Sequence, residues 1–420
     1  MQVAIIGAGI GGLSLALSLH AAGIGCSIHE AAREVRGLGV GINLLPHAGK
    51  ELADLGLLDR ILQIGVSTER LVYLTRRGEQ VWEEPRGLAA GYHWPQVSIH
   101  RGALQLLLRD AVLERLGPDA IYTGQRVVRT ETTEDGRRAR AELVGPDGAP
   151  LPAVSADLIV AADGIHSAVR RQQHPDEGGP SWGGHVLWRG TTVGNPFLGG
   201  NAMVIAGLKG RKFVSYPIRH EADGRQLLNW IANIGLHDQP EGLSADWNRP
   251  GRAEDFLHHY QDWQIADPPI AELVHASGEI FEYPMSDREP LPSWIFGRVV
   301  LLGDAAHAMY PIGSNGAAQA ILDGRRLALE LSRTTDVDAA LRAYDEARRP
   351  PMTRLVTAHR AEGADVVLDL VEERAPDGYA DLEQVLPMAE RVEIAAHYKR
   401  LAGFDIEQLN STPPMTPRSD

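Results

Sequence analysis

The sequence predicts an α/β fold: a parallel sheet with covering helices, interleaved with a second domain built on a β-sheet and followed by a helical segment. Three observations support this prediction. Short apolar runs at 3–6, 158–162 and 299–302 end at Gly or Asp residues, as buried parallel strands do. Short alternating pieces fill 180–290, where most of the tryptophans lie. A helical pattern covers 336–370.

The first thirty residues predict a βαβ unit. A strand over 3–6 precedes a helical apolar face that stops at Gly23, and a second strand over 26–29 ends at Glu30. Such a unit places two parallel strands side by side and leaves the first strand–helix turn at the carboxyl edge of the sheet.

Helix and strand patterns then alternate along the chain. Helices are expected over 101–116 and 317–326, where apolar residues recur at helical spacing. The segment 70–85 has the alternating texture of the second sheet and is assigned to it. The last ten residues, 411–420, are rich in Pro and polar residues and are expected to be disordered.

Composition excludes several classes of protein. With 55 acidic and 41 basic residues, the net charge of −14 argues against nucleic acid or an anionic membrane as the main partner. The lone Cys26 excludes an intrachain disulfide and a cysteine-based metal site, and no metal site is expected. The chain enters its first strand at once, without a signal peptide, and no apolar run is long enough to span a membrane. We therefore expect a cytoplasmic protein.

A G-x-G-x-x-G fingerprint lies between the first strand and the first helix. Gly7 makes the turn, Gly9 lets the backbone approach a pyrophosphate, and Gly12 lets helix and strand pack closely. Glu30, at the end of the second strand, is placed to bind ribose hydroxyls. The fingerprint does not distinguish NAD from FAD. No second copy of it opens a βαβ unit elsewhere, so if this site holds the ADP half of FAD, another segment must hold the flavin.

The stretch "GDAAHAMYPIGSNGA" is the candidate for that other segment. Gly303 and Asp304 follow a predicted strand, at the edge where open α/β sheets bind ligands. A carboxylate there can accept hydrogen bonds from ribityl hydroxyls, although an acid that merely caps a helix would look the same. Pro311 and Gly313 then permit a tight loop before the next helix. We interpret His307 in this stretch as a packing residue rather than an acid–base group.

Three motifs together resemble the FAD-dependent aromatic hydroxylases, the class A flavoprotein monooxygenases related to para-hydroxybenzoate hydroxylase. They are the fingerprint with Glu30, "ADGIHSAVR" with Asp163 and Gly164, and the "GDAAHAMYPIGSNGA" stretch, and they occur in the family's order. In "SIHRGALQLLL", Arg101 fits the family's arginine beside the flavin. The resemblance implies a Rossmann-like FAD-binding domain whose cofactor-binding residues include Gly7, Gly9, Gly12, Glu30, Arg101, Asp163, Gly164, Gly303, Asp304, Gly313, Asn315 and Gly316.

The same resemblance implies how the chain is divided. The FAD-binding domain would be discontinuous, and its second role would be to admit NAD(P)H at the Asp-Gly motif. The implied ranges are 1–70, 98–178 and 286–370 for the FAD-binding domain, 71–97 and 179–285 for the substrate domain, and 371–420 for the C-terminal helical segment and tail.

Within the family, the sequence is similar to phenazine-carboxylate hydroxylases and, next, to salicylate and 3-hydroxybenzoate hydroxylases. The similar pieces are "LWRG", "YPI", "ADWNR" and "YPMSDREPLPSW". The implied reaction consumes NAD(P)H and O2, and a flavin C4a-hydroperoxide hydroxylates an aromatic carboxylate, with loss of CO2 where the attacked carbon carries the carboxylate. The segment 211–217 lacks the histidine that would deprotonate a phenol, which favours an electron-rich N-heteroaromatic substrate. The alternatives are a salicylate-type or hydroxybenzoate-type hydroxylase and a non-catalytic FAD-binding protein. A monomer or a homodimer would serve either function.

Candidate pocket residues come from the second sheet and from the loop after Asp304. Arg189 is the expected contact for a substrate carboxylate, and Trp188 cannot share its face of a regular strand. Lys209, Arg211 and Lys212 are further cations ahead of the Tyr216-Pro217 step. The catalytic candidates are Arg189, Tyr216, Tyr310 and Pro311, and the aromatic candidates for the pocket wall are Trp188 and Trp230.

Overall fold

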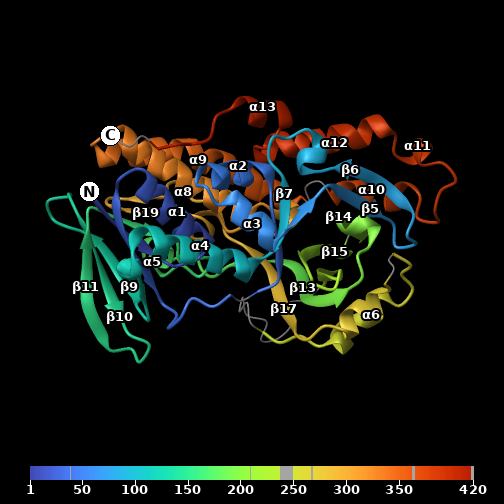
Figure 1. Ribbon diagram of the computed structural model, residues 1–420, viewed down its shortest axis with the longest axis horizontal. Helices are drawn as coiled ribbons and strands as arrows, with labels where there is room; N and C mark the ends of the chain where they lie inside the picture. The colour runs from blue at the N-terminus through green and yellow to red at the C-terminus, as the bar shows by residue number, and fades with distance from the viewer. Residues whose placement is uncertain (38, 209, 237–248, 266–267, 362–364, 418–420) are drawn as a thin grey trace.

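A computed structural model describes residues 1–37, 39–208, 210–236, 249–265, 268–361 and 365–417 (Figure 1). The predicted α/β class is confirmed. A six-stranded sheet, in the order β18-β19-β12-β1-β2-β8, is parallel except for β18. Its strands are β1 Gln2–Ile6, β2 Gly25–Glu30, β8 Ile121–Thr123, β12 Leu158–Ala161, β18 Ile295–Phe296 and β19 Val299–Leu301.

Helices cover this sheet and bury its apolar strands. The predicted βαβ unit is confirmed as β1, α1 (Ile10–Ala21) and β2, and the predicted helix over 101–116 forms α4 with the same bounds. The helix expected over 317–326 is longer than predicted, because apolar residues keep its buried face going to the end of α8. The other helices beside this sheet are α2 Pro46–Asp54, α3 Leu58–Ile64, α5 Ala168–Gln173, α7 Asp304–His307, α8 Gly316–Arg333 and α9 Val337–Arg360.

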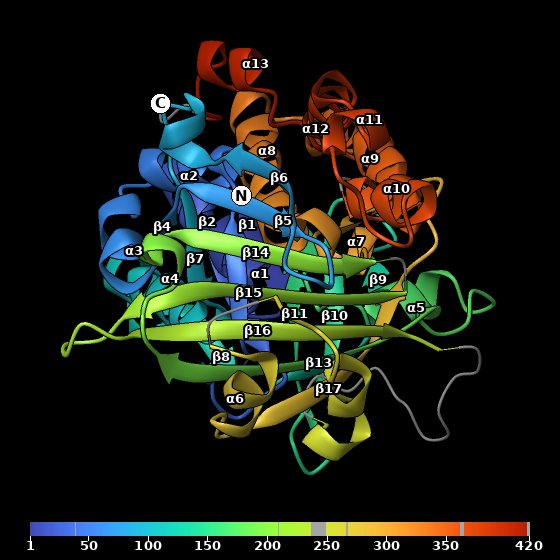
Figure 2. The same cartoon turned by 90° about the vertical axis from the view of Figure 1, so that its right-hand side faces the viewer.

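The second domain is built on a seven-stranded sheet, in the order β17-β13-β16-β15-β14-β5-β6. The segment 70–85 supplies β5 and β6, so its assignment to this sheet is confirmed. Figure 2 shows this sheet face on, with α6 (Ile270–His275) in front of it. The strands are β5 Arg70–Leu74, β6 Gln80–Pro85, β13 Ser181–Gly194, β14 Ala202–Leu208, β15 Arg211–His220, β16 Gln226–Gly235 and β17 Ile280–Asp287.

Two small antiparallel sheets, not predicted from the sequence, complete the strands. One comprises β9 Arg126–Thr132, β10 Ala139–Val144 and β11 Pro150–Ala156, and the other β3 Gly41–Leu44, β4 Val66–Thr68 and β7 Gln96–His100. Short 3-10 turns link several elements: η1 Gly87–Ala90, η2 Pro118–Ala120, η3 Leu198–Gly200, η4 Ala253–Asp255, η5 Leu257–Tyr260 and η6 Ile312–Ser314.

The C-terminal segment packs onto both domains. Side chains of α10 (Val366–Arg374), including Val367 and Leu368, join one buried cluster with residues of the seven-stranded sheet. It is followed by α11 Leu382–Val385, α12 Met388–Ala402 and α13 Ile406–Ser411. The expectation that the tail is disordered is wrong as far as residue 417. The Met415 amide donates to Glu51 at 3.0 Å, and Thr416 donates to Asp54 at 2.9 Å. These acids on α2 satisfy backbone and side-chain groups that composition alone left without a partner.

A buried ion pair ties α8 to α2 beneath this tail. Arg325 is fully buried; its Nε lies 2.9 Å from Glu51, and it also binds Asp54. We expect Arg325→Met to lower the free energy of unfolding by about 3–5 kcal/mol, because it leaves a buried carboxylate without its cation. Urea denaturation measures this loss.

Arg140→Met is the control for that measurement. Arg140 pairs with Glu131 at 3.7 Å on the surface, where an ion pair contributes no more than about 1 kcal/mol. A loss below about 1 kcal/mol in Arg325→Met would contradict a stabilising role for the buried pair.

Candidate active site

Three strand ends meet at one edge of the six-stranded sheet. Ile6 at the end of β1 pairs with Ala161 of β12, and Ala161 pairs with Leu301 of β19. The residues that follow these three positions carry the three sequence motifs. Because parallel strands share a direction, segments about 150 residues apart in the sequence emerge side by side at the carboxyl edge, where such sheets bind ligands.

The glycine loop after β1 has the geometry that a dinucleotide requires. Gly7 has φ +103°, and a Cβ there would lie 2.5 Å from the Ala162 oxygen. A Cβ on Gly12 would lie 2.1 Å from the Gly7 oxygen, so this glycine permits α1 to pack against β1. At Gly9, by contrast, a Cβ would meet nothing within 4 Å. The loop therefore leaves open space at the position where a pyrophosphate would approach the backbone.

Glu30 and a residue that the sequence reasoning missed hold this loop in place. The Glu30 carboxylate accepts the amides of Ala8 at 2.7 Å and Ala32 at 2.8 Å. Gln105 donates to the Ala8 oxygen at 2.8 Å. The available signal was the position of Gln105, one turn into the helix that Arg101 begins.

Asp163 follows β12 and has a free oxygen. One carboxylate oxygen accepts the Ala168 amide at 2.8 Å and so begins α5. The other is buried, with no hydrogen-bond partner in the described part of the chain. Burial raises the pKa of this carboxyl, and hydrogen bonds from Ser167 and the backbone oppose the rise. Gly164, at φ +78°, turns the chain away. A buried acceptor without a partner points to a donor supplied by a ligand.

Asp304 begins α7, directly after Gly303 at φ +61°. Asp304 is exposed although Ala305 and Ala306 beside it are buried. Burial by the surrounding protein nevertheless raises the pKa of its carboxyl, and the positive charges of His307 and Arg101 oppose the rise. We use the term Asp304 recess for the space beside this exposed carboxylate, next to the buried Ala305 and Ala306. Arg101, at the first position of α4, places its charge toward the same recess.

His307 is held in the protein interior by Asp323, which the sequence reasoning missed. The His307 Nε2 lies 2.5 Å from Asp323, and Asp323 also accepts the Gly303 amide at 3.0 Å and the Arg348 Nε at 2.6 Å. Although burial pushes the pKa of Asp323 upward, His307 and Arg348 lower it to about 2. This network supports Gly303 and thereby the start of α7. The only signal for Asp323 was an acid within the predicted helix that begins near Ala317.

The turn after Tyr310 leads into α8. Pro311 is exposed, Gly313 has φ +65°, and Gly316 begins the helix at a point where an added Cβ would meet nothing within 4 Å. Asn315 is fully buried and donates to the Gly313 oxygen at 3.2 Å, while its amide oxygen lacks a partner among the described residues. The turn thus has open space at Gly316 and an unused acceptor at Asn315.

The seven-stranded sheet separates the predicted pocket residues by face. Register pairs Trp188 with Ala232 and Ser215 with Trp230, and both tryptophans pack in the cluster that α6 covers. Strand alternation therefore places Trp188 and Trp230 on the opposite face from Arg189 and Tyr216, so the two sets cannot line one pocket. Arg189 pairs with Ile231 on the other face, as does Tyr216 with Asn229. Tyr310 packs on this second face against Leu187 and Tyr283.

Arg189 lies on this second face, where the described residues supply no countercharge. Its guanidinium lies over the Tyr283 ring at 5.5 Å, and its Nε has no partner in the described ranges. Burial lowers the pKa of Arg189, and Tyr216 and Tyr283 oppose the change. Burial also raises the pKa of Tyr216, so its hydroxyl stays protonated and can donate to an anion. The side chains form a cationic and phenolic patch.

The other predicted cations are already engaged. Lys212 lies 3.6 Å from Asp365, and Arg211 donates to the His259 oxygen at 2.9 Å. Lys209 lies outside the described residues. Arg189 therefore remains the candidate contact for an anionic substrate.

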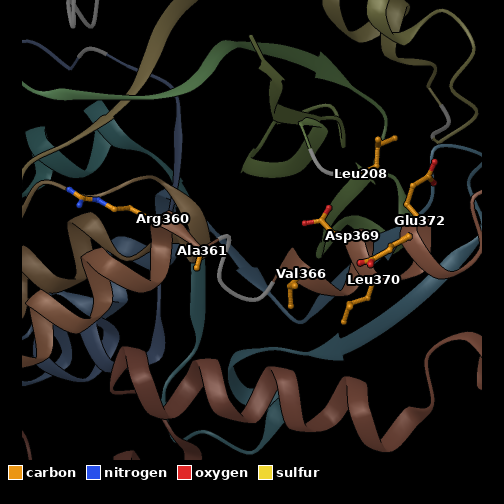
Figure 3. Close-up of a pocket in the computed structure, with 8 residues that line it drawn as sticks. Leu208, Arg360, Ala361, Val366, Asp369, Leu370 and Glu372 are labelled. Atoms are coloured by element: carbon orange, nitrogen blue, oxygen red, sulfur yellow. The ribbon is translucent and has the colours of Figure 1, made fainter. Parts of the chain in front are cut away.

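A cavity of about 630 Å³ opens beside α10 and the end of β14 (Figure 3). Arg360 lies at the opposite end of it from Asp369 and Glu372. No residue of the three motifs lines it, so it is not the dinucleotide site. Its lining residues are Leu208, Arg360, Ala361, Val366, Asp369, Leu370, Glu372 and Glu373.

The described ranges contain neither a metal centre nor a membrane span. No cluster of His, Cys, Asp and Glu in these ranges is arranged to hold a metal ion. No helix there is both long and apolar enough to cross a membrane.

Comparison with known proteins assigns the motifs to a family. The family model described as "FAD binding domain" matches residues 1–197 and 267–359. The chain is 45% identical to a phenazine 1,6-dicarboxylic acid hydroxylase of Lysobacter antibioticus, over 86% of this chain and 89% of that one. It is 30% identical to a 3-hydroxybenzoate 6-hydroxylase of Aquipseudomonas alcaligenes, over 86% and 88%.

A solved structure agrees with these sequence matches. HpxO of Klebsiella pneumoniae, complexed with FAD and uric acid, superposes with a TM-score of 0.74 at 27% identity, covering 98% of this chain and 97% of that one.

The open space at Gly9 generates the first prediction for the cofactor site. We expect Gly9→Val to abolish FAD binding while the protein stays folded, because the side chain occupies the pyrophosphate position and its Cβ meets no protein atom within 4 Å. Absorbance of the purified protein and a thermal melt measure the two effects. Gly278→Val, at another open glycine, should keep its FAD. A yellow Gly9→Val protein would rule out this placement.

The exposed carboxylate of Asp304 leads to the second prediction for the cofactor site. We expect Asp304→Ala to weaken FAD binding by about one to two decades, or roughly 1.5–3 kcal/mol, through loss of charge-assisted hydrogen bonds. Titration of the apoprotein with FAD measures the change. Asp59→Ala is the control, since Asp59 is an exposed acid in the first turn of α3. Equal affinity in the Asp304 and Asp59 variants would contradict a cofactor contact.

Proposed function

This chain belongs to the FAD binding domain family and is an FAD-dependent aromatic hydroxylase, and from that premise we propose that it is an NAD(P)H-consuming monooxygenase acting on an aromatic carboxylate. The observation that carries the substrate proposal is the half-buried Arg189, whose Nε is buried without a hydrogen-bond partner and which pairs with no acid among the described residues, on a face that also presents Tyr216 and Tyr283. A partly desolvated cation without an ionic partner favours an anionic ligand.

The residues at the edge of the six-stranded sheet fit FAD. We propose that the loop from Gly7 to Gly12 holds the pyrophosphate and that Glu30 binds the ribose. The free oxygen of Asp163 and the Asp304 carboxylate accept hydrogen bonds from hydroxyl groups of the cofactor. Bound FAD supplies the redox chemistry, taking electrons from NAD(P)H and delivering one atom of O2 to the substrate.

We propose that a second group of residues lies near the flavin ring. Arg101 is placed toward the Asp304 recess, and the amides that begin α8 at Gly316 face the open space there. We propose that these groups stabilise negative charge on the reduced cofactor. Gly164, Gly303, Gly313, Asn315, Tyr310 and Pro311 shape the same space and keep water out of it.

The substrate binds between this edge and the second face of the seven-stranded sheet. Arg189 pairs with the carboxylate, and the Tyr216 hydroxyl and the Tyr283 ring orient the flat ring system. On this face β15 presents Lys212, Val214 and Tyr216, none of which is a histidine that could deprotonate a phenol. This favours a fused N-heteroaromatic carboxylate, the class named in the relative from Lysobacter antibioticus, over a simple hydroxybenzoate.

The position of attack on the substrate ring decides whether CO2 is released. Attack at the carbon that carries the carboxylate releases CO2, whereas attack elsewhere on the ring retains it.

We propose the division expected from the sequence, with the FAD-binding domain in 1–70, 98–178 and 286–370 and the substrate domain in 71–97 and 179–285. NAD(P)H as the electron donor places the reaction in the cytoplasm.

The proposal is tested with matched carboxylate and carboxamide substrates. We expect a phenazine carboxylate to accelerate NAD(P)H oxidation and the carboxamide to do so much less. We expect Arg189→Ala to raise the KM for the carboxylate by at least about thirtyfold, corresponding to the roughly 2–5 kcal/mol that an unpaired buried charge costs. Product mass distinguishes retained from released CO2.

Arg211→Ala is the control variant. Arg211 belongs to the same sheet, but it binds the His259 oxygen on the face away from the proposed pocket. Equal rates with carboxylate and carboxamide, or an unchanged KM in Arg189→Ala, would reject the carboxylate contact.

A further inference from the structure

The turn between Pro311 and Asn315 is held in an uncommon backbone conformation. Gly313 has φ +65°, and Ser314, which has a side chain, has φ +60°. Non-glycine residues seldom adopt this conformation, because the Cβ crowds the backbone. Gly313 adopts this conformation readily, but Ser314 does not hold it by local preference alone, so contacts from elsewhere help to fix the turn.

One hydroxyl from the C-terminal segment meets this turn at both ends. Tyr398 of α12 is buried, and its oxygen accepts the Asn315 Nδ2 at 2.7 Å. The same oxygen lies 3.3 Å from the Ile312 carbonyl and 3.0 Å from the Nε2 of His359. A single phenol thus connects the first residue of the 3-10 turn with the residue that follows it, and His359 of α9 holds the phenol.

The close packing of Tyr398 against Gly313 and the protonation states of Tyr398 and His359 agree with these hydrogen bonds. A Cβ on Gly313 would lie 1.7 Å from the Tyr398 oxygen, so the glycine and the tyrosine occupy adjoining space with none to spare. Burial raises the pKa of Tyr398 and lowers that of His359 to about 4. Both groups are therefore neutral near pH 7, and the phenol can donate to Ile312 or His359 while it accepts from Asn315.

Asn315 is the residue that this contact orients. Its side chain is fully buried, and its Nδ2 is shared between the Gly313 oxygen and Tyr398. Its amide oxygen is left without a partner among the described residues. With the donor end engaged, the orientation of the amide is fixed and its acceptor end remains available to a bound group.

We propose that Tyr398 is a positioning residue for the Pro311–Asn315 turn, so that the C-terminal segment, which lies outside the family match, sets the cofactor-facing loop. The role toward the cofactor rests on the proposed function, which places the flavin at this turn. Tyr398 does not touch the reacting atoms. It acts through Asn315 and the backbone of Ile312.

The test is Tyr398→Phe, which removes the hydroxyl and keeps the ring. Hydrogen exchange of the apoprotein, followed in peptides covering 308–320, should become about tenfold faster in the turn. FAD affinity should fall by a similar factor, since the bound form of the turn becomes less populated. Asn315→Leu removes the same hydrogen bond from the other side and should give the same exchange pattern if Tyr398→Phe does not fold.

Tyr92→Phe is the matched control. The Tyr92 hydroxyl is also buried and binds the C-terminal segment, donating to the Phe404 oxygen at 2.6 Å, and among the described residues it forms no hydrogen bond with the turn. Faster exchange confined to the Tyr398 variant supports the proposal. Unchanged exchange, or an equal increase in both variants, overturns it.

Measurement of FAD affinity distinguishes a failure of this proposal from a failure of the proposed function. If exchange rises in Tyr398→Phe while its FAD affinity equals that of the parent, the turn does not position the cofactor and the proposal is overturned. If the parent itself does not bind FAD, the proposed function fails, whatever the exchange data show.

Discussion

Parallel pairing of β1 with β12 and of β12 with β19 is the interaction on which the site depends. Because the three strands end level, at Ile6, Ala161 and Leu301, the segments after them must emerge at one edge. Each of those segments then has to leave room for a ligand rather than fill the edge with side chains. Glycines at Gly7 and Gly303 turn the backbone within that limited space, and acids follow where the chain can present an acceptor.

A second constraint comes from burying polar groups around this edge. Asp323 is fully buried, yet it is paired with His307 and Arg348 and receives the Gly303 amide, so the network fixes the backbone just before Asp304. Asp163 and Asn315 differ, since each keeps one buried oxygen without a partner among the described residues. Both atoms lie in motifs that we propose contact the cofactor, where a donor of the bound cofactor would complete their hydrogen bonding.

The seven-stranded sheet has two faces with different roles. The face under α6 is closed by stacked aromatic residues, including Trp188 against Phe256 at 5.2 Å. The other face looks toward the parallel sheet and the C-terminal helices, and it carries Arg189, whose Nε finds no partner within the described ranges. The C-terminal helices are more than a cover, because they supply Tyr398 to the turn and Asp365 to Lys212. The C-terminal segment is thus in contact both with the loop after Asp304 and with the face of the seven-stranded sheet that carries Arg189.

The sequence by itself determined the βαβ unit, the bounds of the helix from Arg101, the membership of 70–85 in the second sheet and the family, because these rest on local periodicity and on short motifs. Tertiary structure decided which face of the sheet each residue takes, and so separated Trp188 and Trp230 from Arg189. It also revealed Gln105, Asp323 and Tyr398, whose partners lie from 16 to 97 positions away in the chain. The tail that composition predicted to be disordered is ordered to residue 417 for the same reason: its hydrogen-bond partners lie on α2, more than 360 residues earlier, and no local pattern records a contact made only by folding.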